Sequence, residues 1–353
     1  MPAEVPAAGL FADAAHAVGP LDEHARRAAR ERHDQLTKPP GSLGELENLG
    51  AHLAAITGTC PPPVPQAPAV AVFAADHGVV DAGVTIWPQE ITALMVETFV
   101  RGGAAINVIA RAVGASVRVV DVGVAADLSA LDSVAHHKVR SGTDNLAESP
   151  AMRRADAVAA LDVGALVARD LIADGHDLLV TGDMGIGNTT AAAALIAALC
   201  GRDASDVTGP GAGSDRETVA RKTRVIADAA ARARRQTDPV GVLAEVGGLE
   251  IAGLAGLIVG GAAARVPVVV DGVITLAALA VADALVPDVA SHCIAGHRST
   301  EPGANAALAH FGLEPLIDLR LRLGEGTGGC LSIPTVVTAA RLLHEMATLP
   351  PTG

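Results

Sequence analysis

Short apolar segments alternate with longer helical patterns through most of this chain. The segments expected to be buried strands are Ala69–Ala75, Val117–Val122, Asp177–Thr181 and Pro267–Val270. Parallel strands need long connections, which are usually helices, and such crossovers are almost always right-handed. Because the alternation continues from Ala69 to about Leu285, it predicts an α/β protein with a parallel, doubly wound sheet.

The core of this protein has to form almost without aromatic side chains. Half of the 353 residues are apolar, but there are only one Trp, four Phe and no Tyr. Alanine, valine, leucine and isoleucine must therefore fill the interior, which suits helices packed on a parallel sheet. The lack of stacking aromatics and the formal net charge of −13 also argue against a nucleic-acid-binding protein.

Several features favour a cytoplasmic protein. The longest apolar runs, Ile251–Ala264 and Gly272–Ala282, are shorter than the roughly 20 residues that a membrane span needs. The N-terminal sequence lacks the basic region of a signal peptide. The four cysteines are scattered and form no CxxC pair. We therefore expect no membrane span and a reducing environment.

A proline-rich stretch, Cys60–Pro68, separates the first strand from what precedes it. Such a composition is typical of an extended linker. Helical patterns at Leu21–Leu36 and about Leu46–Thr57 lie before the linker. The sequence therefore predicts a helical part at the N-terminus, followed by the α/β part.

The first glycine loop, residues 182–190, connects a strand to a helix. Gly182, Gly185 and Gly187 interrupt the apolar run, and an alanine-rich helix begins near Thr189. Glycines let backbone N–H groups approach a ligand, and a helix N-terminus favours an anion. We therefore prefer a phosphate site to a plain turn with a capping threonine. The loop is not a Walker A motif, since no lysine precedes the threonines, and it is not a clean GxGxxG.

The second glycine loop, residues 207–215, precedes another helix. Ser214 and Glu217 have the spacing of a capping box, which predicts that the helix starts there. Lys222 follows within this helix and can reach a phosphate or carboxylate as a point charge. A surface lysine on a polar face is equally compatible with its position.

Polar residues also follow the first strand. Ligands of open α/β sheets bind beyond the carboxyl ends of strands, so Asp76 and His77 are candidates, although a histidine that only holds its loop fits as well. Trp87 either plugs the core or forms the wall of a pocket for a flat aromatic ligand. The residues around His292 and His297 match no standard zinc spacing, so no metal site is expected.

An acid flanked by glycines, Glu325, lies in the segment Leu323–Gly328, here called the Glu325 loop. Flexible backbone around one carboxylate suits a general base that must approach its substrate closely. Spacing alone is as compatible with a surface acid.

A series of motifs occurs in one order along the chain: KPPGSLG (38–44), ADHGV (75–79), PQE (88–90), GDMGIGNTT (182–190), VVVDG (268–272) and LGEGTG (323–328). Together they resemble the nicotinate-nucleotide–dimethylbenzimidazole phosphoribosyltransferases of cobalamin lower-ligand assembly, from about Leu36 to the C-terminus. This resemblance implies a three-layer α/β/α Rossmann-like parallel sheet, a small helical domain built from both chain ends, and a homodimer. We accordingly expect residues 1–65 in the small domain, 66–320 in the large domain, and 321–353 as the catalytic loop and a helix returning to the small domain.

The resemblance also implies a reaction and its residues. Nicotinate mononucleotide and 5,6-dimethylbenzimidazole give α-ribazole 5′-phosphate and nicotinate, with inversion at C1′ and without a cofactor or metal. Glu325 matches the catalytic carboxylate. The benzimidazole pocket matches Trp87, Gln89 and Leu323. The residues that match the phosphoribosyl site are Asp183, Gly185, Gly187, Asn188, Thr189 and Lys222.

Asp183 and Trp87 depart from the family pattern. Asp183 stands where the family more often has Glu, which shortens its reach toward the ribose. Trp87 stands where a smaller aromatic is expected, and this bears on which base fits. The alternatives are a related phosphoribosyltransferase that uses another base and a non-catalytic nucleotide-binding module. A dehydrogenase is disfavoured, because the glycine spacing is wrong and the glycine loop does not follow the first strand.

Overall fold

A parallel sheet of six strands forms the centre of the computed structural model, which describes residues 5–349. The strand order is β3-β2-β1-β4-β5-β6, and every neighbouring pair is parallel. The strands are β1 (Pro68–Ala75), β2 (Ser116–Gly123), β3 (Val134–His136), β4 (Leu178–Met184), β5 (Val268–Val270) and β6 (Cys293–Ala295).

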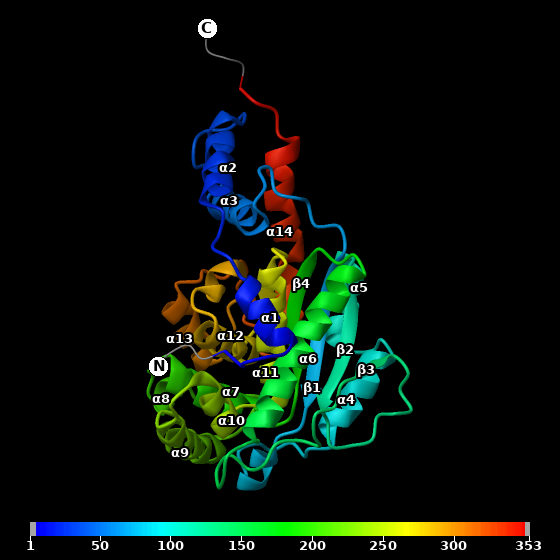
Figure 1. The fold of residues 1–353 in the computed structure, drawn as a ribbon, viewed down its shortest axis with the longest axis vertical. Coiled ribbons are helices and arrows are strands. Elements are labelled where there is room, and N and C mark those ends of the chain that lie inside the picture. Colours follow the sequence, from blue (N-terminus) through cyan, green and yellow to red (C-terminus); the bar gives the residue numbers. More distant parts are fainter. Residues whose placement is uncertain (1–4, 350–353) are drawn as a thin grey trace.

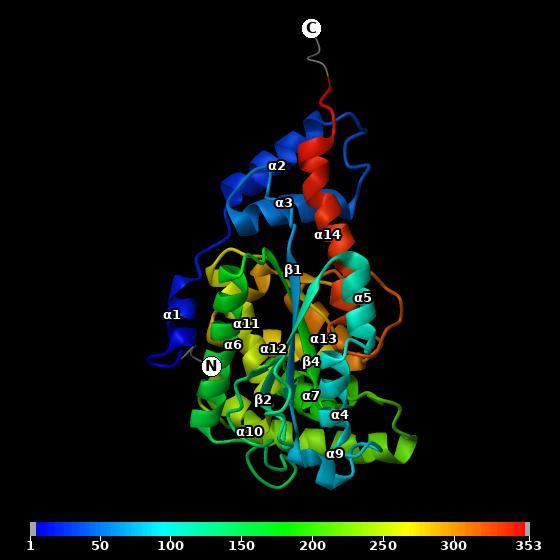
Figure 2. The same cartoon turned by 90° about the vertical axis from the view of Figure 1, so that its right-hand side faces the viewer.

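The helices that connect the strands cover both faces of the sheet (Figures 1 and 2). On one face lie α4 (Ile91–Val100), α5 (Ala105–Val113) and α14 (Thr327–Glu345). On the other lie α6 (Arg154–Ala173), α11 (Leu249–Ala263) and α12 (Val273–Leu285). This arrangement confirms the predicted three-layer α/β/α fold, in which the strand order reverses between β1 and β4.

Further helices pack outside α11 and α12 or connect the strands. The helices of this outer group are α7 (Asn188–Leu199), α8 (Ala204–Val207), α9 (Arg216–Ala233), α10 (Pro239–Val246) and α13 (Pro302–Phe311). Short 3₁₀ helices are η1 (Gly78–Ala82) and η2 (Val289–His292).

Small residues let α6 and α11 approach until their backbones touch. A Cβ atom at Gly164 of α6 would lie 1.8 Å from the carbonyl oxygen of Gly253, and one at Gly256 would lie 2.1 Å from that of Leu161. Gly253 also makes room for the ring of Phe73 in β1. Because the core has few large side chains, its interior is filled by bringing the backbones of α6 and α11 into contact.

Both chain ends contribute to a helical group beyond the end of the sheet where the strands begin (Figures 1 and 2). α2 (Glu23–Gln35), α3 (Glu45–Thr57) and the C-terminal part of α14 pack together there. This agrees with the small helical domain implied by the resemblance. α1 (Leu10–Ala17) instead packs against α6 and α11, and the domain limits at residues 65 and 320 remain predictions.

Some local predictions are wrong. β4 continues through Gly182 and Asp183, so the first glycine loop turns only after Met184. The helix after the second glycine loop is capped by Asp215, whose Oδ1 accepts a hydrogen bond from the N–H of Thr218 at 2.8 Å, and not by Ser214. The sequence pattern also gives no sign of the edge strands β3 and β6.

One segment, Ile91–Val113, is long and apolar enough to cross a membrane by length and composition alone. It consists of α4, with 10 residues, and α5, with 9, and a turn at Gly102 with a φ of 74° separates them. Each helix is shorter than the roughly 20 residues of a membrane span. Val96, Phe99 and Ile106 of this segment are buried against the sheet.

Candidate functional site

Several of the residues expected to form a site lie at or beyond the carboxyl ends of β1 and β4, and the Glu325 loop lies across β4. A Cβ atom at Gly182 would lie 2.7 Å from the carbonyl oxygen of Glu325, and one at Gly326 would lie 3.0 Å from that of Thr181. Only glycine permits this contact between loop and strand. The flexible acid loop predicted from the sequence is thus pressed onto the switch point of the sheet, where ligands of doubly wound folds bind.

Glu325 is buried in an unusual backbone conformation. Its φ is 63°, a left-handed value that costs a non-glycine residue about 1–2 kcal/mol. The residue is only 5% exposed, and its Oε2 accepts a hydrogen bond from the N–H of Ile106, in the first turn of α5, at 3.3 Å. Burial raises the pKa of Glu325, the Ile106 N–H opposes this rise, and the charge of Asp271 adds to it. The carboxylate is therefore a stronger base than one in water, and it is not a surface acid.

Asp183 lies beneath the same loop. A Cβ atom at Gly324 would come within 3.2 Å of its Oδ2, which accepts a hydrogen bond from Nδ2 of Asn188 at 3.0 Å. Burial, followed by repulsion from Asp271 and Glu250, raises the pKa of Asp183 well above its usual range. Asp183 therefore holds its proton more strongly than a carboxyl group in water does.

The first glycine loop uses much of its own backbone internally. The N–H of Asn188 donates to the carbonyl of Gly185 at 3.1 Å, and that of Thr190 donates to Gly187 at 3.0 Å. Gly187 caps α7 with a φ of 94°. Because these N–H groups are already bonded, the loop has fewer free donors than the sequence analysis expects, and an anion here needs other partners.

Lys222 supplies such a partner. Lys222 is 1% exposed, and its Nζ donates to Oγ1 of Thr189 at 2.7 Å and to the carbonyl of Gly209 at 3.3 Å. Burial lowers the pKa of Lys222 to about 8, although Glu301 opposes this change. Lys222 therefore joins the two glycine loops in the interior and is not a surface lysine.

Glu301 is a site residue that the sequence analysis missed. Its Oε1 accepts a hydrogen bond from the N–H of Gly211 at 3.0 Å, which holds the second glycine loop near Lys222. In the sequence it is an acid before a proline at a helix start, which is indistinguishable from an ordinary N-terminal acid.

Trp87 is at the rim of the site and not in the core. It is 43% exposed, and its indole N–H donates to the carbonyl of Ala212 at 3.1 Å. The guanidinium of Arg322 donates to the neighbouring carbonyl of Gly211 at 3.4 Å. The loop before α4 and the residue that precedes the Glu325 loop therefore contact the second glycine loop at adjacent residues. Leu323 is 59% exposed on this rim, and Gln89 is half-buried two residues beyond Trp87.

His77 pairs with Glu250 behind Asp183. Both side chains are fully buried, and Nε2 of His77 lies 2.7 Å from Oε1 of Glu250. Burial disfavours the charged imidazole, but the carboxylate outweighs burial and raises the pKa of His77. His77 thus keeps a buried carboxylate compensated next to the site.

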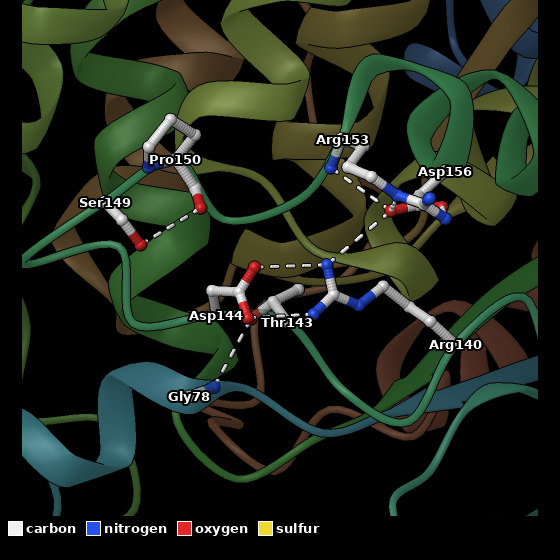
Figure 3. A network of polar contacts seen from close by, with 8 residues as sticks. All are labelled: Gly78, Arg140, Thr143, Asp144, Ser149, Pro150, Arg153 and Asp156. Atoms are coloured by element: carbon white, nitrogen blue, oxygen red, sulfur yellow. Dashed lines mark hydrogen bonds and ion pairs between the residues drawn. The ribbon is translucent and has the colours of Figure 1, made fainter.

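A polar network holds the loop that covers the end of β1 (Figure 3). The N–H of Gly78 donates to Oγ1 of Thr143 at 3.3 Å. The guanidinium of Arg140 lies 2.9 Å from Asp144 and 3.6 Å from Asp156 in the first turn of α6. The covering loop is therefore anchored to a helix that packs on the sheet. Within residues 5–349, no group of three or more His, Cys, Asp or Glu side chains is arranged to hold a metal ion.

Comparison with known proteins agrees with this geometry. The model of the family described as Phosphoribosyltransferase matches residues 18–353. The nicotinate-nucleotide–dimethylbenzimidazole phosphoribosyltransferase of Salinispora tropica is 50% identical over 352 residues, covering 96% of this chain and 97% of that protein. The enzyme of that name from Chloroflexus aurantiacus is 51% identical over 337 residues, covering 95% and 96%.

The solved structures are equally similar. The crystal structure of CobT from Thermus thermophilus matches with a TM-score of 0.89 and 48% sequence identity, covering 92% of this chain and 97% of that chain. Because the family model and these identities extend over nearly the whole length, this chain belongs to the phosphoribosyltransferase family that includes the nicotinate-nucleotide–dimethylbenzimidazole phosphoribosyltransferases.

Proposed function

We propose that this protein transfers the phosphoribosyl group of nicotinate mononucleotide to 5,6-dimethylbenzimidazole, giving α-ribazole 5′-phosphate and nicotinate for the lower nucleotide loop of cobalamin. The observation that carries the proposal is the buried Glu325, whose pKa is raised, at the same strand ends as the pair formed by Lys222 and Thr189. The names of the relatives support the identity of the two substrates. A binding module would need the lysine but no buried base.

The reaction needs one proton acceptor. The pyridine nitrogen of nicotinate mononucleotide is cationic, so nicotinate leaves C1′ with the electron pair of the broken C–N bond. A benzimidazole nitrogen attacks the opposite face, which inverts β to α, and the ring becomes cationic. Glu325 accepts the proton of the other ring nitrogen, a contribution typically worth about 10²–10⁴ in rate. The N–H of Ile106 orients the carboxylate for this step.

The phosphoribosyl group lies, in this proposal, between the two glycine loops. Lys222 and Thr189 bind the phosphate, and Gly185, Gly187 and Asn188 shape the turn around it. Asp183 in its protonated form does not repel the phosphate and can donate a hydrogen bond to a ribose hydroxyl.

The benzimidazole lies at the rim. Trp87 offers an indole face to a flat ring, and Leu323 and Gln89 border the same opening. Because Trp87 is also bonded to Ala212, the position of the second glycine loop bears on the space left for the base.

The direct test is a product assay. Purified protein is incubated with nicotinate mononucleotide and dimethylbenzimidazole, and nicotinate and α-ribazole phosphate are quantified by chromatography. We expect both products in equal amounts. Binding of the nucleotide without release of nicotinate would contradict the proposal, and a panel of other benzimidazoles, adenine and phenols would then separate an enzyme for another base from a binding module.

The substitution Glu325→Gln removes the base but keeps the shape of the side chain. We expect kcat to fall by about 10²–10⁴-fold, with little change in the affinity for nicotinate mononucleotide. Glu314→Gln, which changes an acid with a side chain 82% exposed, serves as the control and is expected to leave kcat unchanged. Full turnover in Glu325→Gln would rule out Glu325 as the base.

The charge of Lys222 should limit the use of nicotinate mononucleotide at high pH. Its pKa of about 8 means that the charge is present below pH 8 and is lost as the pH rises through that value. We expect kcat/KM for nicotinate mononucleotide to fall above pH 8, and Lys222→Met to lower it by roughly tenfold or more at pH 7. Lys222→Arg keeps its charge at these pH values and should remove the decline between about pH 7 and 9.5. A flat wild-type profile over this range would contradict the role of Lys222.

We also propose a cytoplasmic homodimer. All four cysteines are free, as expected in a reducing compartment. Three large apolar side chains, Ile86 in the loop before α4, Leu94 in α4 and Val108 in α5, are more than half exposed. Exposed apolar side chains that gather on one face mark an interaction surface. Light scattering should give twice the mass of the chain, and Leu94→Glu should shift it toward the monomer. A monomer at every concentration would disprove the dimer.

A further inference from the structure

Asp271 connects the end of β5 to the start of α14. It is 1% exposed, and its N–H donates to Oγ1 of Thr181 in β4 at 3.2 Å. Its Oδ1 accepts a hydrogen bond from the N–H of Gly329, in the first turn of α14, at 2.7 Å. Its Oδ2 has no hydrogen-bond partner within residues 5–349. The carboxylate is therefore anchored through one of its two oxygens.

His297, after β6, lies beside this carboxylate. Its Nε2 lies 3.3 Å from Oδ1 of Asp271. The imidazole is pressed against the first turn of α14, since a Cβ atom at Gly328 would lie 2.1 Å from its Cδ2. Close by, a Cβ atom at Gly296 would lie 2.6 Å from Cα of Gly329. The imidazole and the carboxylate thus hold the helix start from two neighbouring strand ends.

The anchored turn is continuous with Glu325. Oγ1 of Thr327 donates to the carbonyl of Gly324 at 2.8 Å, and the N–H of Cys330 donates to that of Gly326 at 2.9 Å. A left-handed φ at a residue such as Glu325 persists only where the surroundings over-determine it. The bond from Gly329 to Asp271 supplies that constraint on the side of the helix.

The charges around Glu325 come from several elements. Asp271 directly follows β5, and its charge raises the pKa of Glu325. Asp183, in β4, also interacts with Glu325 through its charge, and Glu250, which pairs with His77, in turn acts on Asp183. His297, two residues after β6, lies beside Asp271. Of these groups, Asp271 is the one whose charge raises the pKa of Glu325.

We propose that Asp271, oriented by His297, is a positioning residue for the transfer reaction, because it anchors the first turn of α14 and presents a negative charge to the Glu325 carboxylate. This inference rests on the proposed role of Glu325 as the base. It assigns to the aspartate of the VVVDG motif a task that the motif itself does not reveal.

Substitutions of Asp271 separate its anchoring from its charge. Asp271→Asn keeps an oxygen for the Gly329 N–H but removes the charge, so the acidic limb of kcat/KM should move to lower pH by about half a unit or more. Asp271→Ala also removes the anchor, and its plateau kcat should fall about 10–100-fold while KM for the nucleotide stays nearly constant. His297→Ala should show part of this fall in kcat. His297→Gln keeps a hydrogen-bond donor and should restore kcat toward the wild-type value.

The control is Asp283→Asn, because Asp283 also accepts a backbone N–H, that of Ala290 at 3.1 Å, but lies in α12 away from Glu325. We expect its pH profile to match that of the wild type. The thermal unfolding midpoint of each variant is measured alongside, so that kcat is compared only among folded enzymes.

Glu325→Gln in the same assay distinguishes the role of Glu325 as the base from the role of Asp271 as a positioning residue. If Glu325→Gln keeps full turnover, the base assignment and this inference are both wrong. If Glu325→Gln is inactive but Asp271→Asn keeps the wild-type acidic limb and Asp271→Ala keeps the wild-type kcat, only this inference is overturned. A shifted limb in Asp271→Asn with a reduced kcat in Asp271→Ala supports it.

Discussion

The reversal of strand order between β1 and β4 is the constraint on which the site depends. β1 continues into α4 and α5 on one face, whereas β4 continues into the helices that end with α11 on the other, so the two connections diverge. α14 begins on the same face as α5. For this reason the N–H of Ile106 and the carboxylate of Glu325 meet directly over the end of β4.

This crevice collects buried acids, and each is compensated differently. A buried carboxylate is costly unless it is paired, hydrogen-bonded or protonated. Glu250 has an imidazole, Asp271 has an imidazole and a helix N–H, and Glu325 has a helix N–H. For Asp183, burial and neighbouring acids raise the pKa and so favour the protonated form. The cation of Lys222 is placed between the glycine loops, bonded to Thr189. The candidate site therefore separates an acidic half from the half that holds the cation of Lys222.

Sequence reasoning predicted the sheet and most of the loops, because alternation and glycine positions carry local physical information. Glu325 could be selected for the glycines around it, and Gly182 and Gly326 show why they are needed. The three-residue strands β3 and β6 are too short to show a pattern. Glu301 and Asp271 could not be given roles, since their partners are 90 and 58 residues away and such contacts exist only in the folded chain.

The scarcity of aromatic residues has an optical consequence. The chain has no tyrosine and a single tryptophan, so almost all intrinsic fluorescence excited near the red edge of protein absorption comes from Trp87. That indole is half in solvent and is bonded to the second glycine loop through Ala212. The emission of the whole protein therefore reports on one loop contact at the rim of the site, without a label and without background from the core.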